Sequence, residues 1–146
     1  LLQLRQHRVE LGDRGLGRAD GGGRVRSGAG HVDDRSTLEQ MLDTATRIRR
    51  LTRARTREAF ETDEVGQLAL LHLNQRLGEG ACRLTADFRA EHPEFPWAEM
   101  IGMRNRIVHG YDDVDPDIVW RVGSEDIEPV IAGLERALAR ASGRDG

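Results

Sequence analysis

The chain has 146 residues, with 22 basic side chains, 25 acidic side chains and a formal net charge of −3. This length suits one domain that can bury a hydrophobic core without metals or disulfides. The single cysteine, Cys82, excludes an internal disulfide. No apolar run approaches the roughly 18 residues that a membrane-spanning helix needs, so we expect a cytoplasmic protein.

The first 30 residues differ from the rest in charge and composition. They hold six arginines, three acidic residues and eight of the 17 glycines, including Gly21-Gly22-Gly23. Such a segment buries too little apolar surface to offset its ordering entropy. We predict that residues 1–31 are a Gly/Arg-rich disordered tail or the product of a mis-assigned start, with a basic functional arm as the alternative, and that residues 32–146 form the domain.

The remaining residues carry 16 arginines and 22 acidic side chains, and the chain has no lysine. A net-negative body argues against a general nucleic-acid coat protein. Any contact with RNA must therefore come from a local patch of arginines, whose planar guanidinium groups bind phosphate at two points.

The first predicted helix covers residues 35–56. Ser36 and Glu39 form a capping box at its start. Apolar residues then recur at helical spacing: Leu38, Met41, Leu42, Ala45, Ile48 and Leu51. A short helical turn over residues 56–62 should follow and pack Phe60 against the bundle.

The second long helix is predicted from Asp63, a plausible cap, to about residue 90. Its apolar line consists of Val65, Leu68, Leu71, Leu77, Ala81, Leu84 and Phe88. Gly78 and Gly80 interrupt the helical propensity of this stretch. They favour either a kink or a close approach of another helix.

Pro93 and Pro96 end that helix, and a third is predicted over residues 96–110 with Gly110 at its end. Its apolar stripe is Trp97, Met100, Met103 and Ile107. A turn or short helix opens at Asp115-Pro116, and Ser124 is expected to cap the last helix. The pattern predicts an all-α protein, an antiparallel up-and-down bundle of four main helices with short helical turns.

A polar cluster at the end of the third helix carries the candidate chemistry. It comprises Arg104, Asn105, Arg106 and His109, followed by Tyr111, the only tyrosine. Asn105 and His109 share one face, whereas Arg104 and His109 lie about 140° apart on a regular helix. A frayed helix end at Gly110 or a partner subunit would be needed to bring these two side chains together.

This set of side chains suits RNA cleavage without a metal. A histidine is the natural base for a ribose 2′-hydroxyl, and a guanidinium stabilises the phosphate charge that grows in the transition state. Asn105 would fix the imidazole or hold the substrate. Spacing alone leaves structural roles open, because His109 would also suit a helix end and Arg104 would also pair with Asp112 or Asp113.

From about residue 32 to 138 the chain resembles the HepT-like family of HEPN proteins. The segments that carry this resemblance are Leu38–Leu42, Leu77–Ala81, His92–Trp97, Ile101–Tyr111, Val114-Asp115 and Ile118–Trp120. An arginine, four residues and a histidine, with a tyrosine two positions later, form a specific motif when Pro-Trp precedes it and Ile-Val-Trp follows.

The resemblance implies a helical homodimer whose cleft acts as a metal-independent endoribonuclease, with no cofactor. It implies the toxin of a type VII-like toxin–antitoxin system, whose partner is a minimal nucleotidyltransferase that transfers AMP to the motif tyrosine. Arg104 and His109 would be catalytic, Asn105 supporting and Tyr111 the AMPylation target. Glu79 matches a recurrent acid of the family, although pairing with an arginine explains it equally well.

Six arginines between residues 47 and 57 form either a solvated helix face or a strip for phosphate. The candidate RNA or antitoxin contacts are Arg47, Arg50, Arg53, Arg57 and Arg106. The aspartates after the motif suggest a solvated turn with a helix cap, and the histidines and Cys82 match no zinc pattern. The alternative function is a non-catalytic HEPN module that regulates a nucleotidyltransferase or binds a nucleotide.

Overall fold

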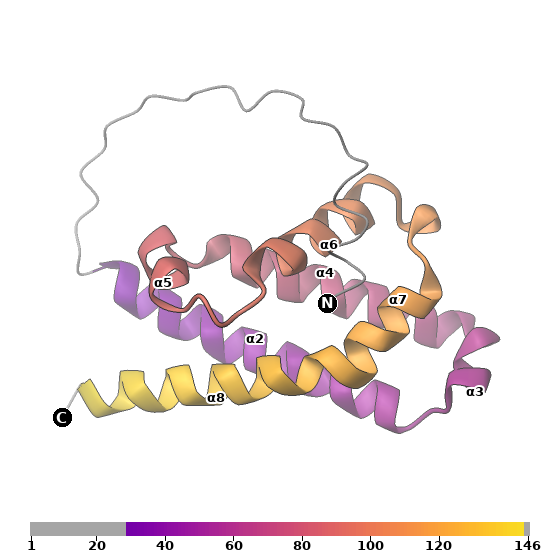
Figure 1. The fold of residues 1–146 in the computed structure, drawn as a ribbon, viewed down its shortest axis with the longest axis horizontal. Helices are drawn as coiled ribbons and strands as arrows, with labels where there is room; N and C mark the ends of the chain where they lie inside the picture. The colour runs from indigo at the N-terminus through magenta and orange to yellow at the C-terminus, as the bar shows by residue number, and fades with distance from the viewer. Residues whose placement is uncertain (1–28, 145–146) are drawn as a thin grey trace.

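The computed structural model describes residues 29–144, and within that range every regular element is helical. The four long helices are α2 (Ala29–Arg53), α4 (Glu64–Arg83), α6 (Trp97–Gly110) and α8 (Ile127–Arg144). Figure 1 shows α2 between α4 and α8, with α6 beside α4. The predicted all-α bundle is confirmed. The predicted tail lies outside the described residues except for its last three, which belong to α2.

Five short elements connect the long helices: α3 (Arg57–Glu61), α5 (Ala86–Glu91), η2 (Tyr111–Asp113), α7 (Pro116–Arg121) and the π-turn η3 (Val122–Asp126). Phe60 of α3 is buried against the bundle, as predicted. None of the helices in the described range is long and apolar enough to cross a membrane.

The hydrophobic core lies where α2, α4 and α8 meet. It is filled by the apolar stripes of these helices, including Leu38, Met41, Ala45, Ile48, Leu70, Leu77, Ala81, Ile127, Ile131 and Leu134. Gly80 provides room for Met41, because a Cβ at Gly80 would collide with the Met41 side chain. Of the two readings of the glycines in α4, the close helix approach is therefore the observed one.

The predicted helix over residues 63–90 is divided into two. Leu84 has an extended backbone (φ −62°, ψ 143°), and the Thr85 side chain caps α5 by accepting from the amide of Phe88. Asp34 of α2 is 5% exposed and accepts hydrogen bonds from the Thr85 amide (3.0 Å) and hydroxyl (2.7 Å). These capping bonds outweigh the helical propensity that favoured one long helix.

The start of the last helix also differs from the prediction. Ser124 does not cap α8, because η3 joins α7 directly to α8 without a break. The Thr52 hydroxyl donates to the carbonyl oxygen of Gly123 at 2.9 Å, and a Cβ at Gly123 would lie 2.8 Å from the Thr52 methyl group. This close contact between α2 and η3 holds the π-turn where an ordinary cap was expected.

Candidate functional site

The beginning of the motif helix α6 is fixed by an aromatic cluster. The indole of Trp97 donates to the carbonyl oxygens of His92 (2.9 Å) and Arg89 (3.1 Å). Its ring stacks on Phe95 with 4.6 Å between centroids. Phe95 in turn fills the space left by Gly133 of α8. The Pro-Trp segment before the motif thus sets the position from which α6 begins.

The middle of α6 lies directly against α4 at Gly78. A Cβ at Gly78 would collide with the Cβ of Arg104 and would lie 2.7 Å from the carbonyl oxygen of Met100. At the other end of α4, Leu68 and Leu71 share a groove with Tyr111. The two helices therefore run antiparallel, with the stem of Arg104 held against α4.

The guanidinium of Arg104 is oriented by its neighbour. Its Nη1 donates to the side-chain oxygen of Asn105 at 2.9 Å, whereas its buried Nε has no hydrogen-bond partner within the described residues. The sequence predicted that Asn105 would hold the His109 imidazole or the substrate. In the structure the side-chain oxygen of Asn105 accepts a hydrogen bond from Arg104 instead. The alternative pairing of Arg104 with Asp112 or Asp113 is not observed.

His109 and Tyr111 lie at the exposed end of α6. The backbone leaves the helical conformation at Gly110 (φ 175°, ψ 79°), and His109 lies before this break, so the change at the helix end does not turn His109 toward Arg104. One chain therefore brings Arg104 and Asn105 together but leaves His109 apart, on a face about 140° away. Tyr111 begins η2 and is 52% exposed.

Tyr111 also lines a surface groove with a volume of about 300 Å³. We call it the Tyr111 groove. It is lined by Phe60, Glu64, Gln67, Leu68, Leu71, Tyr111, Asp112, Val114, Pro116 and Val119. The sequence did not predict it, because Leu68 was assigned to the core but is 48% exposed. The first half of α4 holds more leucines than one buried helix face can accommodate, and this excess was the signal that some of them would be exposed.

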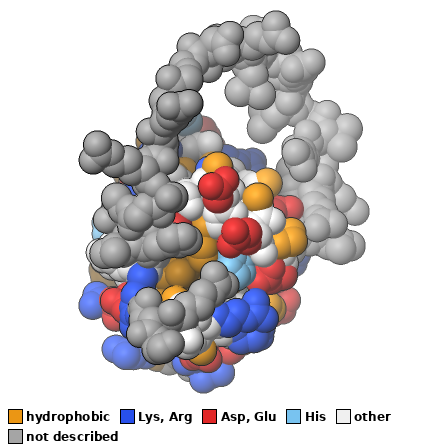
Figure 2. All heavy atoms as spheres, turned by 90° about the vertical axis from the view of Figure 1, so that its left-hand side faces the viewer, with side chains coloured by type: hydrophobic (Ala, Val, Ile, Leu, Met, Phe, Trp, Pro, Cys, Tyr) orange, Lys and Arg blue, Asp and Glu red, His pale blue; other side chains and the backbone are white. Residues whose placement is uncertain are grey.

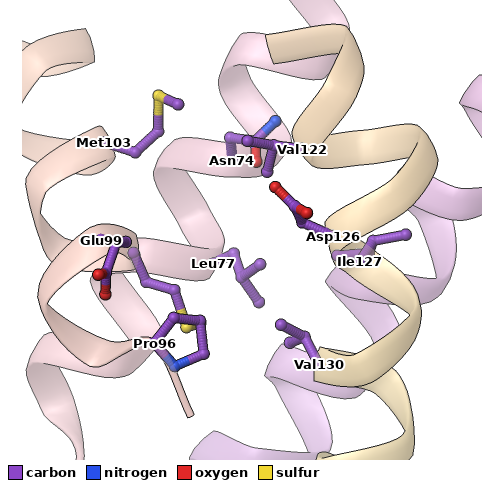
Figure 3. Close-up of a pocket in the computed structure, with 11 residues that line it drawn as sticks. Asn74, Leu77, Pro96, Glu99, Met103, Val122, Asp126, Ile127 and Val130 are labelled. Carbon is purple, nitrogen blue, oxygen red and sulfur yellow. The ribbon is translucent and has the colours of Figure 1, made fainter. Parts of the chain in front are cut away.

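A second, smaller cavity of about 40 Å³ lies on the core side of α6. Figure 3 shows Leu77 at its centre, with Asn74 and Asp126 side chains at one end and Pro96 and Val130 at the other. The Asn74 amide nitrogen donates to the carbonyl oxygen of Leu70. The cavity separates α6 from the start of α8, so the motif helix is held most tightly on its α4 side.

Most of the arginines at the end of α2 contact carboxylates. Arg47 pairs with Asp43 (3.0 Å), Arg49 and Arg53 pair with Glu128 of α8 (3.4 and 2.9 Å), and Arg55 pairs with Asp63. Within the described residues, Arg50 and Arg106 are exposed and form no salt bridge. Some of the arginines between residues 47 and 57 therefore form salt bridges that join neighbouring helices.

The acidic turn after the motif has structural partners. Asp115 caps α7 by accepting from the amide of Asp117 at 2.9 Å, as the sequence suggested. Asp117 pairs with Arg57 at 2.7 Å, and this hydrogen bond and charge raise the pKa of Arg57. Glu79 is half-buried and accepts from Gln75 at 3.1 Å, rather than from an arginine. No group of three or more potential metal ligands occurs in the part of the chain that the structure describes.

Figure 2 views the end of the bundle at the left-hand side of Figure 1, where α5 and the outer ends of α2 and α8 lie. Acidic and basic side chains are interspersed on the described part of this face, with hydrophobic side chains between them. The described part of this face therefore carries side chains of both charges.

An all-helical bundle that carries an arginine, four residues, a histidine and a nearby tyrosine at the end of one helix defines the HEPN class. The family profile described as "Ribonuclease HepT-like" matches residues 41–137, and the chain belongs to this family.

Curated relatives agree with that assignment. The chain is 32% identical over 99 residues to a protein named "Probable ribonuclease HepT" from Thermococcus cleftensis, covering 68% of this chain and 90% of the relative. It is 26% identical over 103 residues to a protein of Methanocaldococcus jannaschii whose name proposes an RNase, covering 70% and 94% of the two chains. A relative from Caldanaerobacter subterraneus with a similar name is 29% identical over 106 residues, covering 73% and 95%. No solved structure matches the chain.

Proposed function

We propose that the protein is a metal-independent endoribonuclease whose site forms between two copies of the chain, with Arg104 and His109 as catalytic residues. The observation that carries this proposal is the arrangement on α6: an arginine ordered by Asn105, and an exposed histidine on a different face of the same helix. Membership of a ribonuclease family supports the class of reaction. A two-fold axis would supply the second histidine that the chemistry needs.

The distribution of exposed apolar side chains supports a dimer through α4 and α6. The large hydrophobic side chains exposed among the described residues are Val65, Leu68, Val108 and Tyr111. All four belong to α4 or to the end of α6 and its continuation. Because these helices run antiparallel, the start of α4, with Val65 and Leu68, lies at the same end of the bundle as Tyr111. Exposed apolar side chains gathered next to a motif are typical of a surface that a partner covers. Val65 and Val108 do not line the Tyr111 groove, so we assign these two side chains to the dimer surface.

The reaction follows from the two side chains. His109 removes the proton of a ribose 2′-hydroxyl, and the 2′ oxygen attacks the adjacent phosphorus. The bond from phosphorus to the 5′ oxygen breaks, which leaves a 2′,3′-cyclic phosphate and a free 5′-hydroxyl. The second copy's His109 protonates the leaving oxygen, and Arg104 stabilises the crowded phosphate. Asn105 supports this step by holding the guanidinium.

Cleavage of RNA in the presence of EDTA tests this proposal. His109→Ala and Arg104→Ala should each lower the rate by at least about a hundredfold, with circular dichroism unchanged. Arg136→Ala is the control, because Arg136 is an exposed arginine of α8, away from the motif helix and from α4. Sedimentation should show a dimer that Val65→Asp disrupts, since Val65 is exposed on α4 and does not line the Tyr111 groove. Full activity of His109→Ala would contradict the catalytic assignment of His109. Tight nucleotide binding with no RNA cleavage would favour the non-catalytic module instead.

Arg50 and Arg106 are the stronger candidates for binding RNA or the antitoxin, since Arg47, Arg53 and Arg57 already face carboxylates. A phosphate contact makes affinity depend on salt. Arg50→Ala and Arg106→Ala should each weaken RNA binding. Each should also reduce the slope of the logarithm of the binding constant against the logarithm of the salt concentration by about one, as expected for the loss of one phosphate contact. Equal salt dependence in wild type and both variants would remove these residues from the interface.

In the cell, the enzyme would be the toxin of a pair whose antitoxin, a minimal nucleotidyltransferase, transfers AMP to Tyr111. Support comes from its exposure and its place two residues after His109. A bulky anionic group there would crowd and repel the RNA backbone. Intact-mass analysis after co-expression with a cognate minimal nucleotidyltransferase should show AMP on the wild type and none on Tyr111→Phe, which should stay toxic.

A further inference from the structure

The Tyr111 groove is a feature that the proposed reaction does not use. Its volume of about 300 Å³ lies at the lower end of the range for small-molecule sites. Leu68, Leu71, Val114 and Pro116 give it apolar walls, and the half-exposed ring of Tyr111 forms its side nearest the motif. Such walls suit a flat ring that enters from the RNA strand, because unpaired bases stack on aromatic side chains.

The polar side chains of the groove are unusual in that nearly all of them can only accept hydrogen bonds. Both protons of the Gln67 amide are committed, since its nitrogen donates to the carbonyl oxygens of Phe60 (2.8 Å) and Glu61 (3.1 Å). Its side-chain oxygen is left as an acceptor. Glu64 and Asp112 add two carboxylates. Among the described residues that line the groove, the hydroxyl of Tyr111 is the one side-chain group that is free to donate.

A ligand for this groove must therefore carry several donors on one edge of a planar ring. Guanine meets that need, because its N1–H and N2 amino group lie side by side and a carboxylate accepts from both. Adenine places an acceptor nitrogen beside its amino group, as does cytosine, and uracil flanks its single N–H with two carbonyls. The carboxylates also repel phosphate, so a base rather than the backbone would enter.

We propose that the Tyr111 groove binds a guanine base of the RNA substrate next to the cleaved phosphate, with Glu64 accepting from the guanine edge and Tyr111 stacking on the ring. This inference rests on the proposed ribonuclease function and adds a base preference to it. Glu64 is the first residue of α4 and is exposed, so its carboxylate is available for the contact.

Calorimetric titration of the full chain with guanosine, inosine and adenosine tests the site without measuring activity. Inosine lacks only the N2 amino group, so it separates a two-point contact from simple stacking. Guanosine should bind about tenfold more tightly than inosine or adenosine, and Glu64→Gln should remove that difference. Glu58→Gln is the matched control, since Glu58 is an exposed acid on the neighbouring helix α3 that does not line the groove.

Equal affinities for the three nucleosides would overturn the inference. So would stronger binding of N-acetyl-arginine amide than of guanosine, which would assign the acidic groove to a basic protein segment instead. RNA cleavage with no preference for guanosine, in a protein that also binds the nucleosides equally, would remove the base preference and leave the ribonuclease intact. Selective guanosine binding without any RNA cleavage would instead contradict the ribonuclease and keep the site.

Discussion

The stem of Arg104 rests directly on Gly78, the glycine of α4 at which the motif helix leaves no room for a side chain. The carbonyl oxygen of Met100 closes the same space from the backbone side. Neither a Cβ atom nor a backbone carbonyl can rotate away, so the spacing between α4 and α6 is set at this point. The position of the guanidinium depends on that spacing, because the rest of the Arg104 side chain extends from it.

Replacing Gly78 with alanine should therefore push α6 away from α4 and displace Arg104. We expect RNA cleavage to fall through kcat by about tenfold or more, since small misplacements of a catalytic group are costly. Gly102→Ala is the matched control, because Gly102 belongs to α6 and has open space around it. That variant should keep its activity and gain up to about 1 kcal/mol from helix propensity. An unchanged kcat in Gly78→Ala would contradict the positioning role.

Thr52→Val tests the bond that holds the π-turn. The valine keeps the shape of the side chain but leaves the carbonyl oxygen of Gly123 without the Thr52 donor. We expect the free energy of unfolding, measured with urea, to fall by about 1–3 kcal/mol. Thr46→Val is the control, because the Thr46 hydroxyl bonds only within α2, to the carbonyl oxygen of Leu42. Equal losses in the two variants would show that the contact with η3 adds nothing.

The stability of the protein should depend on Asp63 in acid. The hydrogen bond from the Gly66 amide, followed by the bond from Arg55, holds the pKa of Asp63 below its ordinary value of 3.8. Because the pKa of Asp63 is lower in the folded state than in the unfolded state, its carboxylate stabilises the fold at pH values above the unfolded-state pKa. This contribution is lost as the pH falls through the folded-state pKa. Wild type should therefore exceed Asp63→Asn in urea midpoint at pH 7, and the gap should close toward pH 2. A gap that stays constant would contradict the assignment.

Glu128 joins the arginines of α2 to the first turn of α8. Its contacts with Arg49 and Arg53 are partly exposed, so Glu128→Gln should lower the free energy of unfolding by about 0.5–1 kcal/mol at low salt. High salt should reduce the loss, because it screens such pairs. Glu135→Gln, farther along α8 and exposed, should change stability less. A loss that does not respond to salt would point to packing instead.

The sequence predicted the long helices well because their apolar spacing is regular. It missed the break at Thr85 and the continuous passage from α7 into α8, since both depend on bonds from α2 by way of Asp34 and Thr52. Such partners are 51 and 71 residues away along the chain, and no local pattern contains them.

The motif residues were found from the sequence, but their arrangement was not fully predicted. Helical spacing predicts that Arg104 and His109 lie on different faces, and both residues belong to α6 before the backbone changes at Gly110. The contact of Asn105 with Arg104 and the support from Gly78 required the packing of two helices. The Tyr111 groove was missed because Leu68 follows the core periodicity of α4 yet is exposed in the structure.

The π-turn has a consequence for how this chain tolerates insertions and deletions. A π-turn holds about one more residue than an α-helical turn, and each residue of an α-helix advances the chain by about 100° around its axis. Losing one residue from Val122–Asp126 would thus turn the register of α8 against that of α7. Ile127, Ile131 and Leu134 would then leave the core together. The length of this five-residue segment is therefore as constrained as the identity of any side chain in it.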